Sequence, residues 1–398
     1  MTGTEPRVRV LEVNYSRQVW GAELVSLEMA GPLARHGVEL TLAAPPGGAL
    51  EEHWRTRGLP FVALEVPERA GIRGSAGDGR PGARALGAEL AATARAVRVL
   101  ARTAAPFDLV RSNSLWAHLD CALAGRVARR AVALDLHDIV APGVGRALLG
   151  LAVHLSATST AISPAVAGCV GRRARARVEL MPLAVDLQRF CPGPVSPDVR
   201  RQLSADPGAP LVGVVGRIDP EKGVDVVVRA MSRLTGSAAR AQLVVVGSGG
   251  LAPEGYPEAV RAEAERLLGA RVRFVGRTGD VPAVLRALDV LVNASVAEPF
   301  GMSVLEAQAC GLAVVGTRAG GIPDFVTDGD NGLLVPSGDA DALAKALEVL
   351  VTDPEGRGRL AARARASAEG HGLEARAEAL AELYRRATGR SADVVARV

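Results

Sequence analysis

The stretch "APLVGVVGRIDPEKGVDVVVRAMSRLT" (209–235) decides the fold class. Its first part, 209–218, is a short valine-rich run, which is typical of a strand that is buried on both faces. Asp219 and Pro220 suit a tight turn, and 223–235 then has apolar residues at helical spacing. A buried strand followed at once by an amphipathic helix is the repeating unit of parallel sheets that carry helices on both faces.

The same strand–helix alternation continues on both sides of this stretch. Further strands are expected at 7–14, 38–45, 107–113, 131–138 and 178–186 in the first half, and at 241–249, 271–277, 290–295 and 332–336 in the second. A proline-rich linker, 186–198, separates the two series. The sequence therefore predicts an α/β protein with two doubly wound domains, 1–188 and 189–375. A last helix, 376–398, is expected to pack back toward the first domain.

Composition narrows the classes of protein. The chain has 398 residues and a net charge of +4, and no apolar run reaches the roughly 18 residues of a membrane span. The N-terminus lacks the pattern of a signal peptide, and the four cysteines have no metal or redox spacing, so we expect a cytoplasmic protein. The basic cluster "GRRARAR" (171–177) has no interleaved aromatics, which argues against a nucleic-acid partner. It leaves peripheral contact with an anionic membrane open, and the oligomeric state is open as well.

Two cations follow the first strand of the predicted second domain. Arg217 lies just past the strand, and Lys222 comes five residues later across the turn. Lys222 is one of only two lysines in the chain. A planar guanidinium and a compact ammonium at a strand end, next to a helix N-terminus, suit a diphosphate. The alternative is a surface turn in which Arg217 pairs with Asp219, or Lys222 with Glu221.

Two carboxylates stand in the nearly uncharged segment "VAEPFGMSVLEAQACG". Glu298 precedes a Pro-Phe-Gly turn at a strand's carboxyl end, and Glu306 lies on the following apolar helix. The backbone amides of Phe300, Gly301 and Met302 are expected to form the N-terminus of that helix. A buried, unpaired carboxylate is costly, whereas two carboxylates near free amides suit a ligand rich in hydroxyls. The alternative is one glutamate at a helix start and one exposed glutamate.

Together these motifs resemble those of the GT-B glycosyltransferases, and of glycosyltransferase family 4 in particular. The resemblance rests on the Glu-x7-Glu spacing of Glu298 and Glu306, on "GRIDPEKG", on "GGIPDFVTDGDNGLLVP" (320–336), on "HD" at 137–138 and on "WGAE" at 20–23. It implies two Rossmann-like domains that face each other across a cleft. It also implies transfer of a sugar from a nucleotide-diphosphate sugar to a hydroxyl group, with retention of the anomeric configuration.

The resemblance implies a role for each matching residue on the donor side. Glu298 contacts the sugar hydroxyls, Glu306 the ribose, and Arg217 and Lys222 clamp the diphosphate. His137 faces the donor sugar near the reaction centre. The implied catalytic residues are Glu298, His137, Arg217 and Lys222. The implied donor-binding residues are Gly216, Arg217, Lys222, Arg277, Glu298, Phe300, Gly301, Met302 and Glu306, with Arg277 at the nucleotide base.

The departures from the family pattern lie on the acceptor side. Trp20-Gly21 stands where the family often has two glycines, and Arg111 stands where a histidine is common. We expect acceptor contacts from Trp20, Gly21, Arg111, Asn113 and Asp138.

Donor, acceptor and activity each have alternatives. A UDP-sugar is the favoured donor and a GDP-sugar the next. The acceptor is expected to be a hydroxyl of a small molecule or natural product, or alternatively a lipid or polysaccharide of the cell envelope. Another class is a nucleotide-sugar epimerase or a non-catalytic nucleotide-sugar binding protein. A nicotinamide oxidoreductase is disfavoured because the first strand is not followed by G-x-G-x-x-G.

No cofactor or essential metal is expected. Two fixed cations can replace a metal at the leaving diphosphate. The sequence "DGD" (328–330) matches a metal-binding Asp-x-Asp, but its glycine and the asparagine that follows favour a turn.

Overall fold

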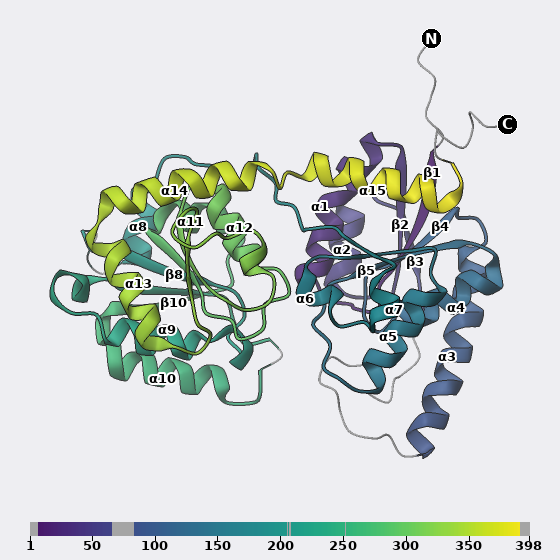
Figure 1. Ribbon diagram of the computed structural model, residues 1–398, viewed down its shortest axis with the longest axis horizontal. Coiled ribbons are helices and arrows are strands. Elements are labelled where there is room, and N and C mark those ends of the chain that lie inside the picture. Colours follow the sequence, from purple (N-terminus) through teal and green to yellow (C-terminus); the bar gives the residue numbers. More distant parts are fainter. Residues whose placement is uncertain (1–6, 66–82, 205, 207, 251, 391–398) are drawn as a thin grey trace, which may run out of the picture. The chain divides into compact units, whose positions relative to one another are not determined.

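The computed structural model describes residues 7–65, 83–204, 206, 208–250 and 252–390. It divides into two compact units (Figure 1). The first unit contains the described residues up to Ala184 together with those from Leu373 onward, and the second is Val185–Gly372. The chain therefore leaves the first unit after Ala184 and returns to it at Leu373. The predicted domain boundary, between 188 and 189, lies a few residues after the first of these crossings.

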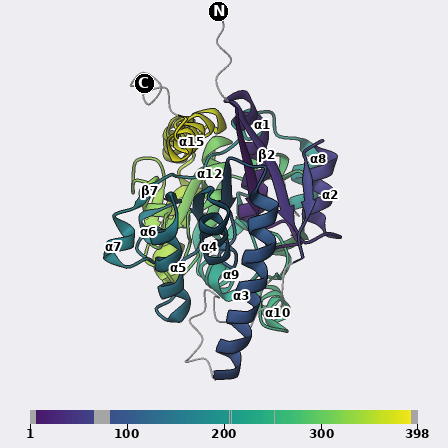
Figure 2. The same cartoon turned by 90° about the vertical axis from the view of Figure 1, so that its right-hand side faces the viewer.

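The first unit is built on a seven-stranded parallel sheet in the order β3-β2-β1-β4-β5-β6-β7. Its strands are β1 Val8–Val13, β2 Val38–Ala44, β3 Phe61–Ala63, β4 Leu109–Ser112, β5 Ala131–Leu136, β6 Thr158–Ala161 and β7 Val178–Leu180. The larger helices are α1 Gly21–Arg35, α2 Ala49–Thr56, α3 Ala83–Ala104, α4 His118–Ala128 and α5 Val144–Leu155. Two single-turn helices, α6 Pro164–Ala167 and α7 Arg172–Arg175, follow β6. Helices α3, α4 and α5 lie side by side along the sheet (Figure 2).

The helix predicted at 376–398 is described as α15, which begins at Leu373 and ends at Thr388. Residues 391–398 lie outside the described part of the chain. Helix α15 packs against α1 and against the strands β4 and β5 (Figure 1). Its anchors include an ion pair of Glu374 with Arg35 and a hydrogen bond of 2.8 Å from Arg385 to the carbonyl of His36. The end of the chain thus completes the first unit.

The second unit has a six-stranded parallel sheet in the order β10-β9-β8-β11-β12-β13. Its strands are β8 Leu211–Val215, β9 Gln242–Val246, β10 Val272–Gly276, β11 Val290–Asn293, β12 Ala313–Thr317 and β13 Leu333–Val335. Its α-helices are α8 Pro197–Leu203, α9 Val224–Ser232, α10 Tyr256–Leu268, α11 Val281–Ala287, α12 Met302–Ala309, α13 Ala340–Thr352 and α14 Pro354–Glu369. Short 3-10 turns are η1 Pro220–Lys222, η2 Gly236–Arg240, η3 Gly269–Arg271 and η4 Ile322–Asp324. Valines of β8, β9, β11 and β12 form much of the core.

Both sheets reverse their strand order at a single point. In the first unit the reversal lies between β1 and β4, and in the second between β8 and β11. Ligands of open α/β sheets bind outside the carboxyl ends of the strands at such a switch point, because the two loops diverge there. The topology therefore marks the loops after β8 and β11, and those after β1 and β4, as the places to look for a site.

Candidate functional site

The loops after β8 and β11 are tied to each other. The amide of Val296, after β11, donates a hydrogen bond of 2.8 Å to the carbonyl of Glu221, after β8. Asp219 caps η1 by accepting a bond of 3.2 Å from the amide of Lys222. Gly223 has a φ of +61°, and a Cβ there would lie 2.3 Å from the carbonyl oxygen of Ala294. Only glycine permits this close approach. Gly223 therefore allows the loop after β8 to pack directly against the loop after β11.

Glu298 is the buried centre of this arrangement. Its carboxylate oxygen Oε2 accepts hydrogen bonds from Lys222 Nζ at 2.7 Å, from Ser295 Oγ at 2.9 Å and from Asn293 Nδ2 at 3.1 Å. The residue is 7% exposed. Within the described residues, all three of these donors reach Oε2 and none reaches Oε1. The second carboxylate oxygen is therefore the one available to a ligand.

The charge on Glu298 is fixed by its neighbours. Burial by itself would raise the pKa of Glu298, but the Lys222 ammonium and the hydrogen bonds from Lys222, Asn293 and Ser295 outweigh it and lower the pKa. The side chain is therefore an anion at neutral pH. An anion with one free oxygen is an acceptor for hydroxyl donors.

Arg217 and Lys222 behave differently in the structure. Arg217 Nε lies 3.1 Å from Asp219 Oδ2, which is the pairing considered for a plain surface turn. Lys222 pairs with Glu298 rather than with Glu221. The Arg217 side chain is 29% exposed, so part of its fork can still reach a phosphate.

The helix after Glu298 begins where the sequence predicts. Gly301 is the N-cap of α12 with a φ of +112°, and Met302 is the first helical residue. The ring of Phe300 is buried and stacks on Phe325 with centroids 5.0 Å apart, so its backbone rather than its ring faces any ligand here. Glu306 is half-buried on the same helix.

The loop after β12 packs against the main chain of Glu298. The amide of Gly321 donates a hydrogen bond of 2.8 Å to the carbonyl of Glu298. Gly320 has a φ of +61°, and a Cβ there would lie 1.8 Å from that carbonyl oxygen. The two glycines of the "GGIPD" sequence therefore position the main chain of Glu298.

The remaining donor-side predictions lie at strand ends of the same sheet. Gly216 directly follows β8 and is half-buried. Arg277 is exposed in the loop after β10, two strands away from β8. Their assignment to nucleotide binding stays a prediction. Asn293 and Ser295 were not predicted. The signal for them is the pair of polar residues at the end of the apolar run "VLVNAS".

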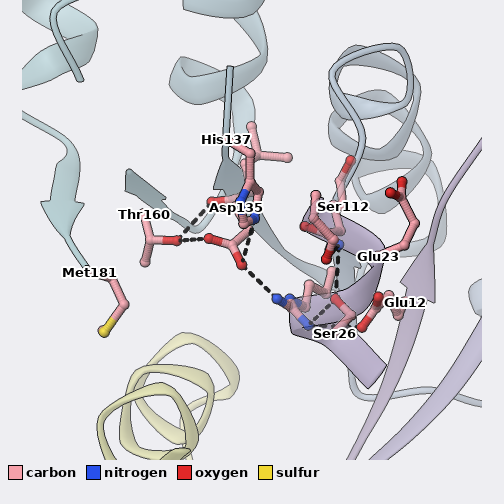
Figure 3. Close-up of polar contacts among 12 residues, drawn as sticks. Glu12, Glu23, Ser26, Ser112, Asp135, His137, Thr160 and Met181 are labelled. Atoms are coloured by element: carbon pink, nitrogen blue, oxygen red, sulfur yellow. Dashed lines mark hydrogen bonds and ion pairs between the residues drawn. The ribbon is translucent and has the colours of Figure 1, made fainter. Parts of the chain in front are cut away.

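In the first unit, His137 follows β5 and lies against an acidic residue of that strand. His137 Nε2 is 3.3 Å from Asp135 Oδ2, and the imidazole is 8% exposed (Figure 3). Asp135 was not predicted as a site residue. Its signal in the sequence is a charge inside the apolar strand "AVALDL".

Arg111 and Asn113 are not placed to touch an acceptor, which corrects the prediction made for them. Arg111 is 0% exposed and pairs with Glu12 at 2.8 Å and with Asp135 at 2.6 Å. Asn113 is 2% exposed, and its Nδ2 donates to Ser26 Oγ at 2.8 Å. The position of Arg111 at a strand end led to the prediction that it faces a ligand. Instead, its ion pairs with Glu12 and Asp135 on the neighbouring strands keep its side chain buried.

Trp20, Gly21 and Asp138 lie at strand ends of the first unit. Trp20 is 38% exposed and is the N-cap of α1, with its amide donating to Glu23 Oε2 at 3.1 Å. Gly21 is the first residue of α1, in the loop region after β1. Asp138 is exposed after β5. These positions leave all three within reach of a ligand, and acceptor binding stays a prediction.

An open hollow of about 580 Å³ lies at the carboxyl ends of β1 and β2. It is lined by Gln18, Gly47, Gly48, Ala49, Glu51, Glu52 and Arg55. Glu51 accepts hydrogen bonds from Arg55 Nε at 2.8 Å and from the amide of Gly47 at 2.7 Å. The lining combines four polar or charged side chains with two glycines and an alanine, and the polar side chains can bind a small molecule that carries hydroxyl groups.

The two aspartates of "DGD" are engaged by the protein. Asp328 accepts a bond of 2.9 Å from the amide of Leu334 and pairs with Arg318. Asp330 pairs with Arg363. Gly329 between them has a φ of +75°, as a tight turn requires. Among the described residues there is no group of three or more His, Cys, Asp or Glu side chains arranged to hold a metal ion.

Within the described part of the chain, none of the helices combines the length and the apolarity that crossing a membrane requires.

Comparison with known proteins identifies a family pattern in the second unit. Residues 195–367 match the family model "Glycosyl transferases group 1". A D-inositol 3-phosphate glycosyltransferase from Kribbella flavida is 39% identical over 222 residues, which are 54% of this chain and 52% of the relative. The chain spans about half the length of the curated relatives it matches.

Solved structures match nearly the whole chain. A crystal structure of Anabaena Alr3699/HepE in complex with UDP and glucose has a TM-score of 0.77 and 24% identity, covering 95% of this chain and 99% of that one. Sucrose-phosphate synthase from Thermosynechococcus elongatus has a TM-score of 0.76 and 21% identity, covering 97% and 100%. Residues 195–367 therefore carry the pattern of the group 1 glycosyl transferases, and the chain as a whole has the GT-B fold of two Rossmann-like domains.

Proposed function

We propose that this chain is a retaining glycosyltransferase of family 4 that uses a nucleotide-diphosphate sugar, with a UDP-sugar as the favoured donor. The observation that carries the proposal is the part-buried Lys222–Glu298 pair at the β8/β11 switch point, in which all three protein donors to the Glu298 carboxylate reach Oε2. The match of 195–367 to the group 1 model supports it. The structural relative that contains UDP and glucose supports the choice of donor.

The chemistry follows from the charges at this point. Breaking a sugar–phosphate bond develops negative charge on the leaving diphosphate, and preorganised cations stabilise that charge most effectively where water is excluded. The Arg217 guanidinium faces Asp219 and Glu221 but is still 29% exposed, so it is the first cation for the phosphates, and Lys222 is the second. Glu298 Oε1 accepts a hydrogen bond from a sugar hydroxyl and holds the ring in place.

Retention fits the state of Glu298. A carboxylate whose pKa is lowered by an ammonium and by hydrogen bonds is a weaker nucleophile than a free one, because these donors already stabilise its negative charge. We therefore propose a front-face reaction in which the leaving phosphate takes the proton of the acceptor hydroxyl. The acceptor is proposed to be a small polar molecule at the hollow beside β1 and β2. The name of the Kribbella relative makes an inositol phosphate the first acceptor to try.

The test is a donor and acceptor screen with a matched pair of variants. UDP- and GDP-sugars are ranked by thermal shift, and products with each acceptor are identified by mass spectrometry. Glu298→Gln is expected to lower turnover by at least about a hundredfold. Glu258→Gln, an exposed glutamate at the start of α10, is the control and is expected to react like the wild type. Normal turnover by Glu298→Gln would refute the proposed role.

The same screen separates the other classes. An epimerase would release free nucleotide or an isomerised donor without any acceptor. A binding protein would show a thermal shift with a nucleotide sugar and no product with any acceptor tried.

A further inference from the structure

Asp135 is a buried carboxylate at the centre of a polar cluster in the first unit. Its Oδ1 accepts a hydrogen bond of 2.7 Å from Thr160 Oγ1, and its Oδ2 accepts one of 2.6 Å from Arg111 (Figure 3). The same Oδ2 lies 3.3 Å from His137 Nε2. Asp135 is 3% exposed. Strands β4, β5 and β6 therefore hold one carboxylate in a fixed orientation against one imidazole.

The carboxylate is held in its charged form. Burial would raise the pKa of Asp135, but His137, Arg111 and Arg376 outweigh it and keep the pKa well below its ordinary value. Arg376, on α15, is 5% exposed and places NH2 3.7 Å from Asp135 Oδ2. Arg111 also pairs with Glu12. The guanidiniums of Arg111 and Arg376 thus balance the charges of the Glu12 and Asp135 carboxylates. The imidazole of His137 is the fifth group of this polar cluster.

This cluster is not arranged for stability alone. Among the described residues, Arg111 Nε, His137 Nε2 and both Nε and NH2 of Arg376 are buried without a hydrogen-bond partner, although His137 Nε2 and Arg376 NH2 lie 3.3 Å and 3.7 Å from Asp135 Oδ2. Buried ions with incomplete hydrogen bonding cost free energy, and apolar side chains of similar volume usually replace them without loss. Because this arrangement lowers stability, we look for a functional role of the cluster. His137 is its partly exposed residue.

The second histidine nearby does not compete for Asp135. His118, on α4, is buried, and its pKa is lowered to about 3, first by burial and then by His137. Its Nδ1 lies 2.8 Å from Ser112 Oγ. A neutral His118 bonded to a serine leaves His137 as the imidazole that the carboxylate acts on.

We propose that Asp135 is a positioning residue that fixes the tautomer and the orientation of His137. An anionic oxygen at Nε2 favours the imidazole that carries its proton there. In the neutral imidazole Nδ1 is then the acceptor nitrogen, so a ligand group that meets it must be a hydrogen-bond donor. This assigns His137 to a hydroxyl of the bound sugar or acceptor rather than to a phosphate or carboxylate oxygen. The proposal rests on the proposed function for the identity of that ligand.

The first test reads the imidazole directly and needs no turnover. Long-range ¹H–¹⁵N spectra of uniformly labelled protein report the tautomer of each histidine, and His137→Gln identifies the signals of His137. In the wild type we expect His137 as the Nε2–H tautomer. Asp135→Asn is expected to shift it toward the Nδ1–H tautomer, because the amide can donate to Nε2. Unchanged ¹⁵N shifts of His137 would overturn the proposal.

The matched control is Asp120→Asn. Asp120 is a fully buried aspartate of the same unit that accepts a hydrogen bond of 2.8 Å from Tyr15. We expect this variant to leave the His137 signals in place. Because Asp135→Asn also removes the partner of two buried guanidiniums, Thr160→Val is the second variant. It deletes the hydrogen bond to Oδ1, keeps the charge, and is expected to produce a smaller shift in the same direction.

The second test asks whether Asp135 acts through His137. In the wild-type background, Asp135→Asn is expected to lower kcat about ten- to a hundredfold with little change in KM. In the His137→Gln background the same change is expected to cost less than twofold. An equal loss in both backgrounds would show that Asp135 acts independently of His137. Loss of the tautomer preference in a chain that transfers no sugar would uphold this proposal and refute the proposed function.

Discussion

Replacing Lys222 with methionine removes the charge partner of a buried carboxylate, and its cost can be worked from the structure. At the Nζ–Oε2 distance of 2.7 Å, two unit charges attract by roughly 6 kcal/mol at an effective dielectric constant of about 20. Desolvation of both groups opposes this attraction. The Lys222 side chain is 20% exposed and that of Glu298 is 9% exposed, so the remaining attraction is screened only in part.

We expect Lys222→Met to lower the free energy of unfolding by about 3 kcal/mol at pH 7, in the range found when one partner of a buried pair is deleted. A cycle with Glu298→Gln isolates the pair itself. We expect a coupling free energy of about 2 kcal/mol. The exposed pair Arg233–Asp341, at 3.2 Å with side chains 43% and 75% exposed, is the control and should couple by less than about 1 kcal/mol.

The contribution of Glu298 to the free energy of unfolding changes with pH, and the direction of its pKa shift determines how. The folded-state pKa of Glu298 is lowered below its ordinary value of 4.5, so its contribution to stability is present above that pH and is lost as the pH falls through the folded-state pKa. Without Lys222, burial is opposed only by the hydrogen bonds from Asn293 and Ser295, so the pKa of Glu298 rises relative to the wild type. The anion then contributes less to stability at neutral pH than it does in the wild type. The difference between wild type and Lys222→Met should therefore be largest near pH 7 and shrink toward pH 4.

The assay is urea unfolding followed by two probes. All three tryptophans, Trp20, Trp54 and Trp116, belong to the first unit, so tryptophan fluorescence reports that unit. Far-UV circular dichroism reports both units. We expect Lys222→Met to lower the urea midpoint of the dichroism transition. The midpoint of the fluorescence transition should stay unchanged. A coupling as small as that of the control pair would refute the reasoning, because Glu298 would then be solvated rather than held by Lys222.

Four further outcomes follow from the second unit. Arg217→Gln should weaken binding of a nucleoside diphosphate by about tenfold or more in calorimetry and leave the nucleoside unaffected, and equal losses would exclude the phosphate role. Transfer should survive excess EDTA, and a loss that magnesium reverses would restore a metal at 328–330. Gly320→Ala should lower stability by several kcal/mol and abolish transfer, because its Cβ would lie 1.8 Å from the carbonyl oxygen of Glu298. Gly329→Ala, with a φ of +75° and open space around it, should cost only about 1–2 kcal/mol of backbone strain, as measured by urea unfolding.

The sequence was sufficient for the parts of the molecule that depend on local pattern. Strand β8, the turn at 219–223 and helix α9 follow one another within the opening stretch, and each has its own signal in the residues. The positions of Arg217, Lys222 and Glu298 at strand ends follow from the same pattern. The contact between Lys222 and Glu298 spans 76 residues, so no local pattern could reveal it.

The role of Arg111 could not be predicted from the local sequence pattern. Its place at the end of β4 was correct, but its partners lie on other strands. Glu12 is its cross-strand neighbour in the β1–β4 register, 99 residues away in the chain. Asp135 is on β5, on the other side of β4. Choosing between a ligand and an ion pair required the register of three strands. The available clue was the presence of charges inside three apolar strands, Arg9 and Glu12 in β1, Arg111 in β4 and Asp135 in β5, whose signs sum to zero.

The two sheets of this chain allow the purpose of those charges to be judged by comparison. They share one strand order, so β1, β4 and β5 correspond to β8, β11 and β12. The strands of the second unit, LVGVV, VLVN and AVVGT, contain no charged residue. The same strand order therefore forms with uncharged central strands, so the topology by itself does not require Glu12, Arg111 and Asp135. Because the desolvation of a buried ion pair often costs more than the pair returns in stability, we attribute these charges to the group of the cluster that is partly exposed, the imidazole of His137.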